Sequence, residues 1–149
     1  MKIEIDQSGK IENTSRLTIL AYSNKTSKSI LITAKDKKTI QSLFRRINQP
    51  KIFIYKLFSV AIFALIKNDL EKIDQVIIDR EYVGYENLIK KLISETVERN
   101  NKKIEKENIH FHSIGKKSKA HKIALAAFKT KRADMRLTSK EFFKIGLVK

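Results

Sequence analysis

Acidic side chains stand just beyond two predicted strands, where carboxylates are well placed to do chemistry. Asp6 ends a short alternation of apolar and polar residues and precedes a polar turn at 7–10. Asp79 and Glu81 follow the continuous apolar run 76–78, and they share one side of the chain if the strand continues. Carboxylate oxygens are the ligands that Mg²⁺ and Mn²⁺ prefer. An Asp before a turn also bonds its own backbone, and charges after a strand also return the chain to solvent, so both interpretations stay open.

The three histidines offer two further candidates for proton or metal chemistry. His121 falls in the first turn of a predicted helix whose N-cap is Ser118, where it is either a solvated residue or a group that reaches a site. His110 and His112 share one face of a predicted strand and resemble a metal-binding pair. No third ligand stands near them in the sequence, so we expect these two side chains to pack on the sheet or to face solvent.

Lysines surround the start of the same predicted helix and suggest a phosphate contact. Free backbone N–H groups at a helix N-terminus and the ammonium groups of Lys116, Lys117 and Lys119 together suit an anion. A lysine-rich loop also serves solubility alone. The whole chain carries 32 Lys and Arg against 16 Asp and Glu, a formal charge of +16, and at that charge we favour phosphate contact.

The charge is divided unevenly along the chain. Residues 1–68 hold 13 basic and 4 acidic side chains, residues 69–100 hold 5 and 8, and residues 101–149 hold 14 and 4. The net contributions are therefore +9, −3 and +10. An acidic middle between basic ends is what a metal-dependent nuclease needs, and a solvated, charge-rich helix produces the same pattern. Nucleic acid is the expected partner.

Several enzyme classes are disfavoured by what the sequence lacks. There is no cysteine, so neither a disulfide framework nor a thiolate metal site can form, which suits a reducing compartment. Ser8 lies outside any Gly-x-Ser-x-Gly elbow, and the four glycines form no phosphate-binding loop. These absences argue against a serine hydrolase, an ATPase and a dehydrogenase. The first residues have no apolar signal-peptide core, so we expect a cytoplasmic protein.

Strands and helices must position these residues. The first third of the sequence has the pattern of three strands, and the rest has the pattern of helices interspersed with strands. The five predicted strands lie at 3–6, 17–22, 29–33, 76–78 and 109–114. The predicted helices lie at 40–47, 52–67, 86–97, 118–128 and 138–145. Short connections favour antiparallel hairpins among the first three strands, and helical crossovers favour parallel pairing of the last two. The 149 residues therefore predict a single α/β domain with a mixed five-stranded sheet, three antiparallel strands then two parallel, flanked by helices.

The segment 52–66 is the most apolar of the chain. It is only 15 residues long and contains Lys56, whereas a membrane span needs about 20 residues. We therefore expect a helix buried in the core and no membrane partner. A peripheral membrane protein that uses this helix is the remaining alternative. The run 76–78 is likewise expected to be a central strand that is buried on both faces.

The order of elements, β-β-β-α-β-α-β-α with an Asp in the first strand, resembles the ribonuclease H-like superfamily, here with one extra helix after the third strand. Three segments carry the resemblance: Ile3–Gly9 (IEIDQSG), Val76–Glu81 (VIIDRE) and Gly115–His121 (GKKSKAH). Together they are similar to a small archaeal-type nuclease of that superfamily, closest in layout to its RuvC-like branch.

The resemblance implies a metal site as well as a fold. In the superfamily the first strand supplies an Asp, the end of the fourth strand a carboxylate, and the last helix an Asp or His. These positions correspond to Asp6, to Asp79 or Glu81, and to His121. We favour Glu81 over Asp79 because it lies further towards the open edge of the sheet. The acid that ribonuclease H carries on its first helix has no counterpart here, since residues 37–49 contain no acid.

Two functions are expected. The first is a metal-dependent nuclease in which Asp6, Asp79, Glu81 and His121 hold Mg²⁺ or Mn²⁺, with Asp6, Glu81 and His121 as the catalytic residues. The basic residues that would guide the backbone of DNA or RNA are Lys116, Lys117, Lys119, Lys122, Lys131, Arg132 and Arg136. The alternative is a non-catalytic nucleic-acid-binding module with the same fold, whose binding is indifferent to divalent metal.

Overall fold

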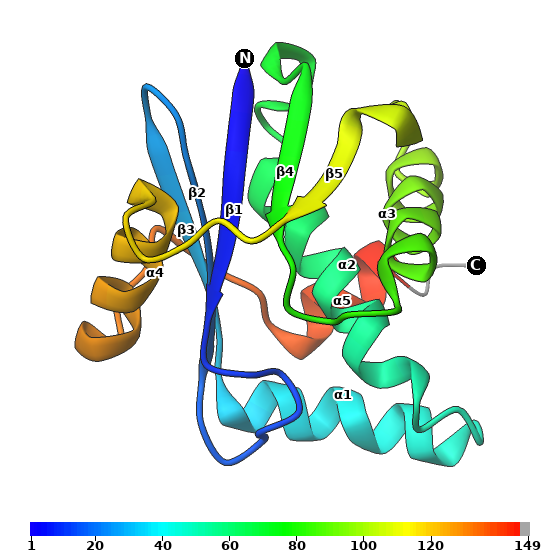
Figure 1. Ribbon diagram of the computed structural model, residues 1–149. Coiled ribbons are helices and arrows are strands. Elements are labelled where there is room, and N and C mark those ends of the chain that lie inside the picture. The colour runs from blue at the N-terminus through cyan, green and yellow to red at the C-terminus, as the bar shows by residue number, and fades with distance from the viewer. Residues whose placement is uncertain (147–149) are drawn as a thin grey trace.

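A mixed six-stranded sheet forms the centre of the protein (Figure 1). The computed structural model describes residues 1–146. The strands are β1 (Lys2–Ser8), β2 (Thr18–Ser23), β3 (Ser27–Ile32), β4 (Gln75–Asp79), β5 (Ile109–His112) and β6 (Met135–Arg136). Their order across the sheet is β5-β4-β1-β2-β3-β6, so β1, which carries Asp6, lies in the interior of the sheet.

Strand pairing follows the predicted pattern for five of the six strands. β1 pairs with β2 and β2 with β3 in antiparallel fashion, whereas β4 runs parallel to β1 and β5 runs parallel to β4. The prediction of five strands is wrong in number, because β6 adds to β3 through only two residues, Met135 and Arg136. Two residues carry no alternation that a sequence pattern could reveal.

Five α-helices and two short 3-10 turns connect the strands within residues 1–146. The helices are α1 (Ala34–Arg46), α2 (Ile52–Ile66), α3 (Glu86–Arg99), α4 (Lys119–Thr130) and α5 (Ser139–Gly146), and the 3-10 turns are Leu70–Lys72 and Lys106–Asn108. The predicted N-cap of α4 is confirmed, since the Ser118 side chain accepts a hydrogen bond from the N–H of Ala120. Thr33 caps α1 in the same way through the N–H of Asp36.

The two faces of the sheet are covered differently. On one face, Ile5, Ile78 and other alternate strand residues pack with α1, α2, α3 and α5 in the main core. On the other face, Ile19 and Ala21 pack against Ala124 of α4, which stands apart from the other helices in Figure 1. Helix α4 packs on β1, β2 and β3. Among the described residues, the sheet therefore has one face under four helices and one face under a single helix.

Strand β4 is not buried on both faces as predicted. Val76 and Ile78 are buried, but Ile77 between them is only half-buried. Ile77 points to the face that carries α4, but α4 packs mainly on β1, β2 and β3. Ile77 is therefore covered only in part.

Helix α2 is the buried helix that its apolar sequence predicts. Most of its residues are buried, and even Lys56 is only 6% exposed. No helix within residues 1–146 combines the length and the apolar character that crossing a membrane requires.

Candidate carboxylate and histidine site

Two parallel strands bring the predicted acidic residues to the same level of the sheet. In the pairing of β1 with β4, Ile5 lies beside Ile78, so Asp6 and Asp79 follow next to each other. Both carboxylates point to the face on which α4 packs, because Ile5 and Ile78 point into the main core. The carboxyl ends of parallel strands are where open α/β sheets bind ligands.

Asp6 joins β1 to the first turn of α4. Its Oδ2 lies 2.8 Å from Nδ1 of His121, and its Oδ1 accepts a hydrogen bond of 2.8 Å from the N–H of Gln7. Two residues earlier on the strand, Glu4 accepts a hydrogen bond of 3.0 Å from the hydroxyl of Ser118, the N-cap of α4. These acids hold the start of α4 against the sheet and fix the position of His121.

Asp79 fixes the loop that leads from β5 to α4. Its Oδ1 accepts a hydrogen bond of 2.9 Å from the N–H of Ile114. The next two residues, Gly115 and Lys116, then line the same hollow as Asp79. Gly115 has a φ of +82°, a conformation that glycine adopts without strain. Asp79 therefore places Lys116 beside the carboxylates as well as contributing its own charge.

Glu81 lies close to two other carboxylates, those of Asp79 and Asp6. Its N–H donates to the carbonyl of Asp79, but its carboxylate accepts no hydrogen bond from residues 1–146. Burial raises the pKa of Glu81, and the negative charges of Asp79 and Asp6 raise it further. Burial also raises the pKa of Asp6, against hydrogen bonds from Gln7 and His121 that lower it. A bound cation would relieve this burial and repulsion of negative charge.

All four predicted site residues line one small hollow of about 250 Å³. Its lining residues are Asp6, Gln7, Asp79, Glu81, Gly115, Lys116 and His121. Gln7 and Gly115 were not among the predicted site residues. A lone glycine between a predicted strand and a predicted helix was a usable signal for Gly115, whereas nothing in the sequence marks Gln7.

The set of donors suits a hard divalent cation, but the side chains do not converge on one point. Carboxylates with a flanking imidazole are ligand types that Mg²⁺ and Mn²⁺ accept. Within residues 1–146, however, no three His, Asp or Glu side chains are arranged so that they could hold a metal ion. Three of the four are already engaged, since Asp6 and His121 contact each other and Asp79 accepts a hydrogen bond from the N–H of Ile114. Metal binding therefore requires a rearrangement of these side chains.

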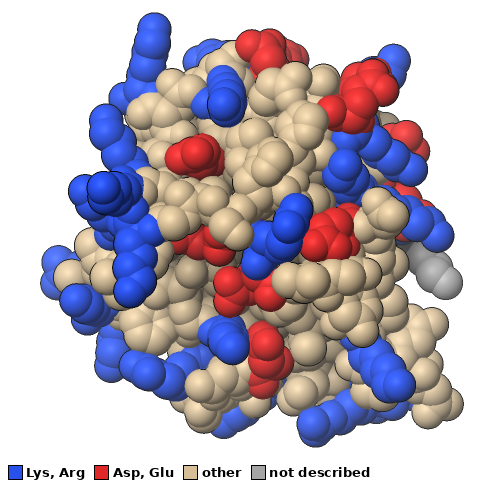
Figure 2. Space-filling view, viewed as in Figure 1, with Lys and Arg blue, Asp and Glu red and all other residues tan. Residues whose placement is uncertain are grey.

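One group of the predicted phosphate-contacting lysines lies at the hollow. Lys116 lines it, and Lys117, Lys119 and Lys122 are exposed in the loop and in the first turns of α4. Figure 2 shows basic side chains gathered along the edge of the molecule where α4 lies, and acidic side chains in the middle of the same face. This arrangement puts positive charge beside the carboxylates.

A second group of predicted phosphate-contacting residues lies away from the hollow. Lys131 and Arg132 follow the last turn of α4, about 15 Å from His121 along the helix axis at the usual rise per residue. Arg136 lies on β6 at the edge of the sheet beyond β3, and its Nη2 pairs with Asp36 Oδ2 at 2.8 Å. Any backbone contact of these residues is therefore remote from the carboxylates.

His110 and His112 lie on the edge strand β5, away from the hollow around Asp6. Nε2 of His110 lies 2.6 Å from Oε1 of Gln75, and His112 is exposed. Neither belongs to a group of three ligands within residues 1–146.

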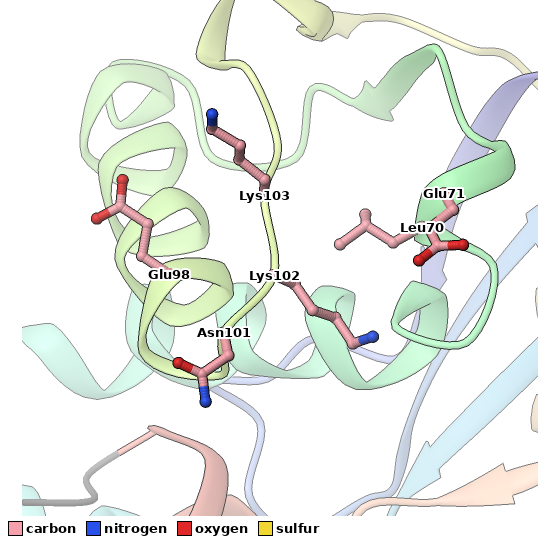
Figure 3. A pocket seen from close by; sticks show the side chains of 6 residues that line it. All are labelled: Leu70, Glu71, Glu98, Asn101, Lys102 and Lys103. Atoms are coloured by element: carbon pink, nitrogen blue, oxygen red, sulfur yellow. The ribbon is translucent and has the colours of Figure 1, made fainter.

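A larger hollow of about 540 Å³ lies between the Leu70 turn and the end of α3 (Figure 3). It is lined by Leu70, Glu71, Glu98, Asn101, Lys102 and Lys103. The Glu98 and Lys102 side chains point away from each other in Figure 3. The acidic and basic groups of this hollow are mixed and do not point toward one another. It is therefore a weaker candidate for a functional site than the hollow around Asp6.

Comparison with known proteins gives no family for the chain. No protein-family model matches it, and neither a curated protein nor a solved structure matches it. Its function must therefore be inferred from the hollow and from the charges around it.

Proposed function

We propose that the protein is a divalent-metal-dependent phosphodiesterase that cuts nucleic acid. The observation that carries the proposal is the meeting of Asp6, Asp79 and Glu81 with His121 at one hollow. Lys116 at the same hollow supplies a positive charge for a phosphate. Three antiparallel strands followed by two parallel ones support the ribonuclease H-like resemblance from which this site was predicted.

Each side chain has a role that follows from its position. Asp6, Asp79 and Glu81 would hold one or two Mg²⁺ or Mn²⁺ ions, which when bound activate water and stabilise the departing oxygen. His121 orients the Asp6 carboxylate through Nδ1, which leaves Nε2 to exchange a proton with water. Lys116 would bind the phosphate, and the exposed lysines at the start of α4 would extend that contact along the backbone.

The test is a cleavage assay with Mg²⁺ or Mn²⁺ on single-stranded, duplex, branched and RNA-containing oligonucleotides. The wild type should cut at least one of them and should stop when the metal is chelated. Asp6→Asn and Glu81→Gln should lower the rate by about 100-fold or more, because each removes a negative charge without changing shape. The matched control is Glu105→Gln, an exposed acid outside the hollow, which should cut at the wild-type rate. Inactivity of the wild type on the whole panel, with no metal bound, would contradict the proposal.

A non-catalytic nucleic-acid-binding module is the second candidate, and one observation favours it. Within residues 1–146 no three ligands are arranged for a metal. This candidate predicts binding that weakens with salt but is unchanged by Mg²⁺, by Asp6→Asn and by Glu81→Gln. Fluorescence anisotropy of a labelled oligonucleotide, measured with and without Mg²⁺, distinguishes it from the phosphodiesterase when it is combined with the cleavage assay.

A further inference from the structure

A basic pocket of about 320 Å³ lies at the far end of α4, between that helix and the turn that follows β1. Its lining residues are Ser15, Arg16, Leu17, Thr33, Ala34, Phe128 and Lys131. The lining joins two cations to an apolar wall and contains no acidic residue. The hydroxyls of Ser15 and Thr33 donate to Asn13 and Asp36. This is the composition expected of a site for an anion that also has an apolar or sugar part.

The exposed side chain of Arg16 lies over the apolar wall of the pocket. Its guanidinium carbon lies 4.8 Å from the ring centroid of Phe128, within the range of a cation–π contact. Gly9 packs closely behind that ring, since a Cβ at Gly9 would come within 2.5 Å of it. A stacked guanidinium keeps its planar set of N–H donors available for an oxyanion.

Lys131 adopts a backbone conformation that a lysine rarely takes. Its φ is 58° and its ψ is 33°, the left-handed region, at the C-cap of α4. The other non-glycine residues with positive φ in residues 1–146 are Asn48 and Asn101, a residue type that tolerates it. Glycine is the usual residue where a helix ends in this way. A glycine at position 131 would relieve the backbone strain. The presence of lysine there therefore indicates a use for its side chain.

The two cations of the pocket have no acidic partner among the described residues. No ion pair within residues 1–146 involves Arg16 or Lys131. Thr33 and Ala34 begin α1, but Asp36 in the first turn offsets the partial positive charge at that end of the helix and accepts a hydrogen bond from the Thr33 hydroxyl. The positive charge of the pocket therefore comes from the side chains of Arg16 and Lys131.

From these observations we infer that the pocket formed by Arg16, Phe128 and Lys131 binds a second backbone phosphate of the same nucleic acid. The inference rests on the proposed function. Ten residues separate Lys131 from His121, about 15 Å along α4, so one nucleic acid that lies along this helix could contact both the hollow and the pocket. The pocket thus sets the register of the backbone relative to the carboxylate hollow.

The test measures binding of a labelled 20-nucleotide duplex to the Asp6→Asn protein without divalent metal, so that cleavage plays no part. Arg16→Ala and Lys131→Gly should each weaken binding roughly three- to tenfold at about 0.1 M salt. In the double variant, the plot of log association constant against log salt concentration should become less steep by about 0.9, which corresponds to the loss of one phosphate contact. Lys131→Gly should also raise the melting temperature, because glycine relieves the left-handed strain. A lysine with a merely structural role would not give weaker binding together with higher stability.

The matched control is Lys129→Ala, an exposed lysine of α4 that lines neither hollow, which should change binding less than twofold. Unchanged binding by the double variant, or an equal loss in Lys129→Ala, would show that the pocket is not a phosphate site. The cleavage assay would still test the proposed function. An Asp6→Asn protein that binds no nucleic acid would overturn the pocket and the proposed function together. A wild-type protein that binds through the pocket but cuts no substrate would contradict the proposed enzymatic activity and leave the phosphate site supported.

Discussion

The two faces of the central sheet are built from alternate residues of the same strands, and they differ in kind. Ile5 and Ile78 enter the main core under four helices, whereas the next residues, Asp6 and Asp79, turn to the face on which α4 packs. The period of two along a strand makes this possible, because one step in sequence moves a side chain to the other face. One face holds the main core, and the other combines a smaller apolar cluster with the buried carboxylate of Asp6.

The largest expected effect separates the two faces within one strand. Ile78→Ala should lower the free energy of unfolding by about 2–5 kcal/mol, because Ile78 is 1% exposed in the main core. Ile77→Ala, one residue away, should lower it by less than about 1.5 kcal/mol, since Ile77 is only half-buried. Urea denaturation of both variants measures the difference. Equal losses would show that both faces of β4 stabilise the fold alike.

A smaller effect is expected where the turn after β1 supports α4. Gly9 has a φ of +80°, and a Cβ there would come within 2.4 Å of the carbonyl oxygen of Leu17 and within 2.5 Å of the Phe128 ring. Gly9→Ala should therefore lower the free energy of unfolding by about 2–4 kcal/mol, from backbone strain and overpacking together. The control is Gly84→Ala, where φ is +91° but no atom lies within 4 Å, and there we expect only about 1–2 kcal/mol. A loss at Gly84 as large as the loss at Gly9 would mean that the contact with Phe128 adds nothing.

Much of this architecture could be predicted because its signals are local. The alternation around Ile5, the short connections of the first hairpins and the Ser118 cap each depend on neighbouring residues only. The carboxylates Asp6 and Asp79 could be placed together because parallel strands bring their ends to the same edge.

The remaining features depend on contacts between distant segments. The half-exposure of Ile77 follows from where α4 packs, which no property of β4 determines. The hydrogen bond between Asp6 and His121 depends on the docking of α4. The stacking of Arg16 on Phe128 joins residues that share no sequence pattern. Strand β6 has too few residues to show a period.

The smallest expected effect is on the free energy of unfolding, to which the buried Asp6 carboxylate contributes unfavourably when it is charged. The pKa of Asp6 is raised in the folded protein, so the proton binds more tightly to the folded chain than to the unfolded one. The stability that this group contributes is present below about pH 4 and is lost as pH rises through the folded pKa. Asp6→Asn should therefore be more stable than the wild type at pH 7.5, and the advantage should shrink towards pH 4. Urea denaturation at the two pH values measures it. A variant less stable at pH 7.5 would mean that the hydrogen bonds from His121 and Gln7 outweigh burial.

The most direct test of the carboxylate site is a diffraction experiment on crystals soaked in Mn²⁺, with an anomalous difference map. We predict a Mn²⁺ peak bounded by the carboxylates of Asp6, Asp79 and Glu81 in the wild type, and loss of that peak in Glu81→Gln. No peak at this hollow, in crystals whose carboxylates keep their present hydrogen bonds, would contradict the assignment of metal-dependent chemistry to this face of the sheet.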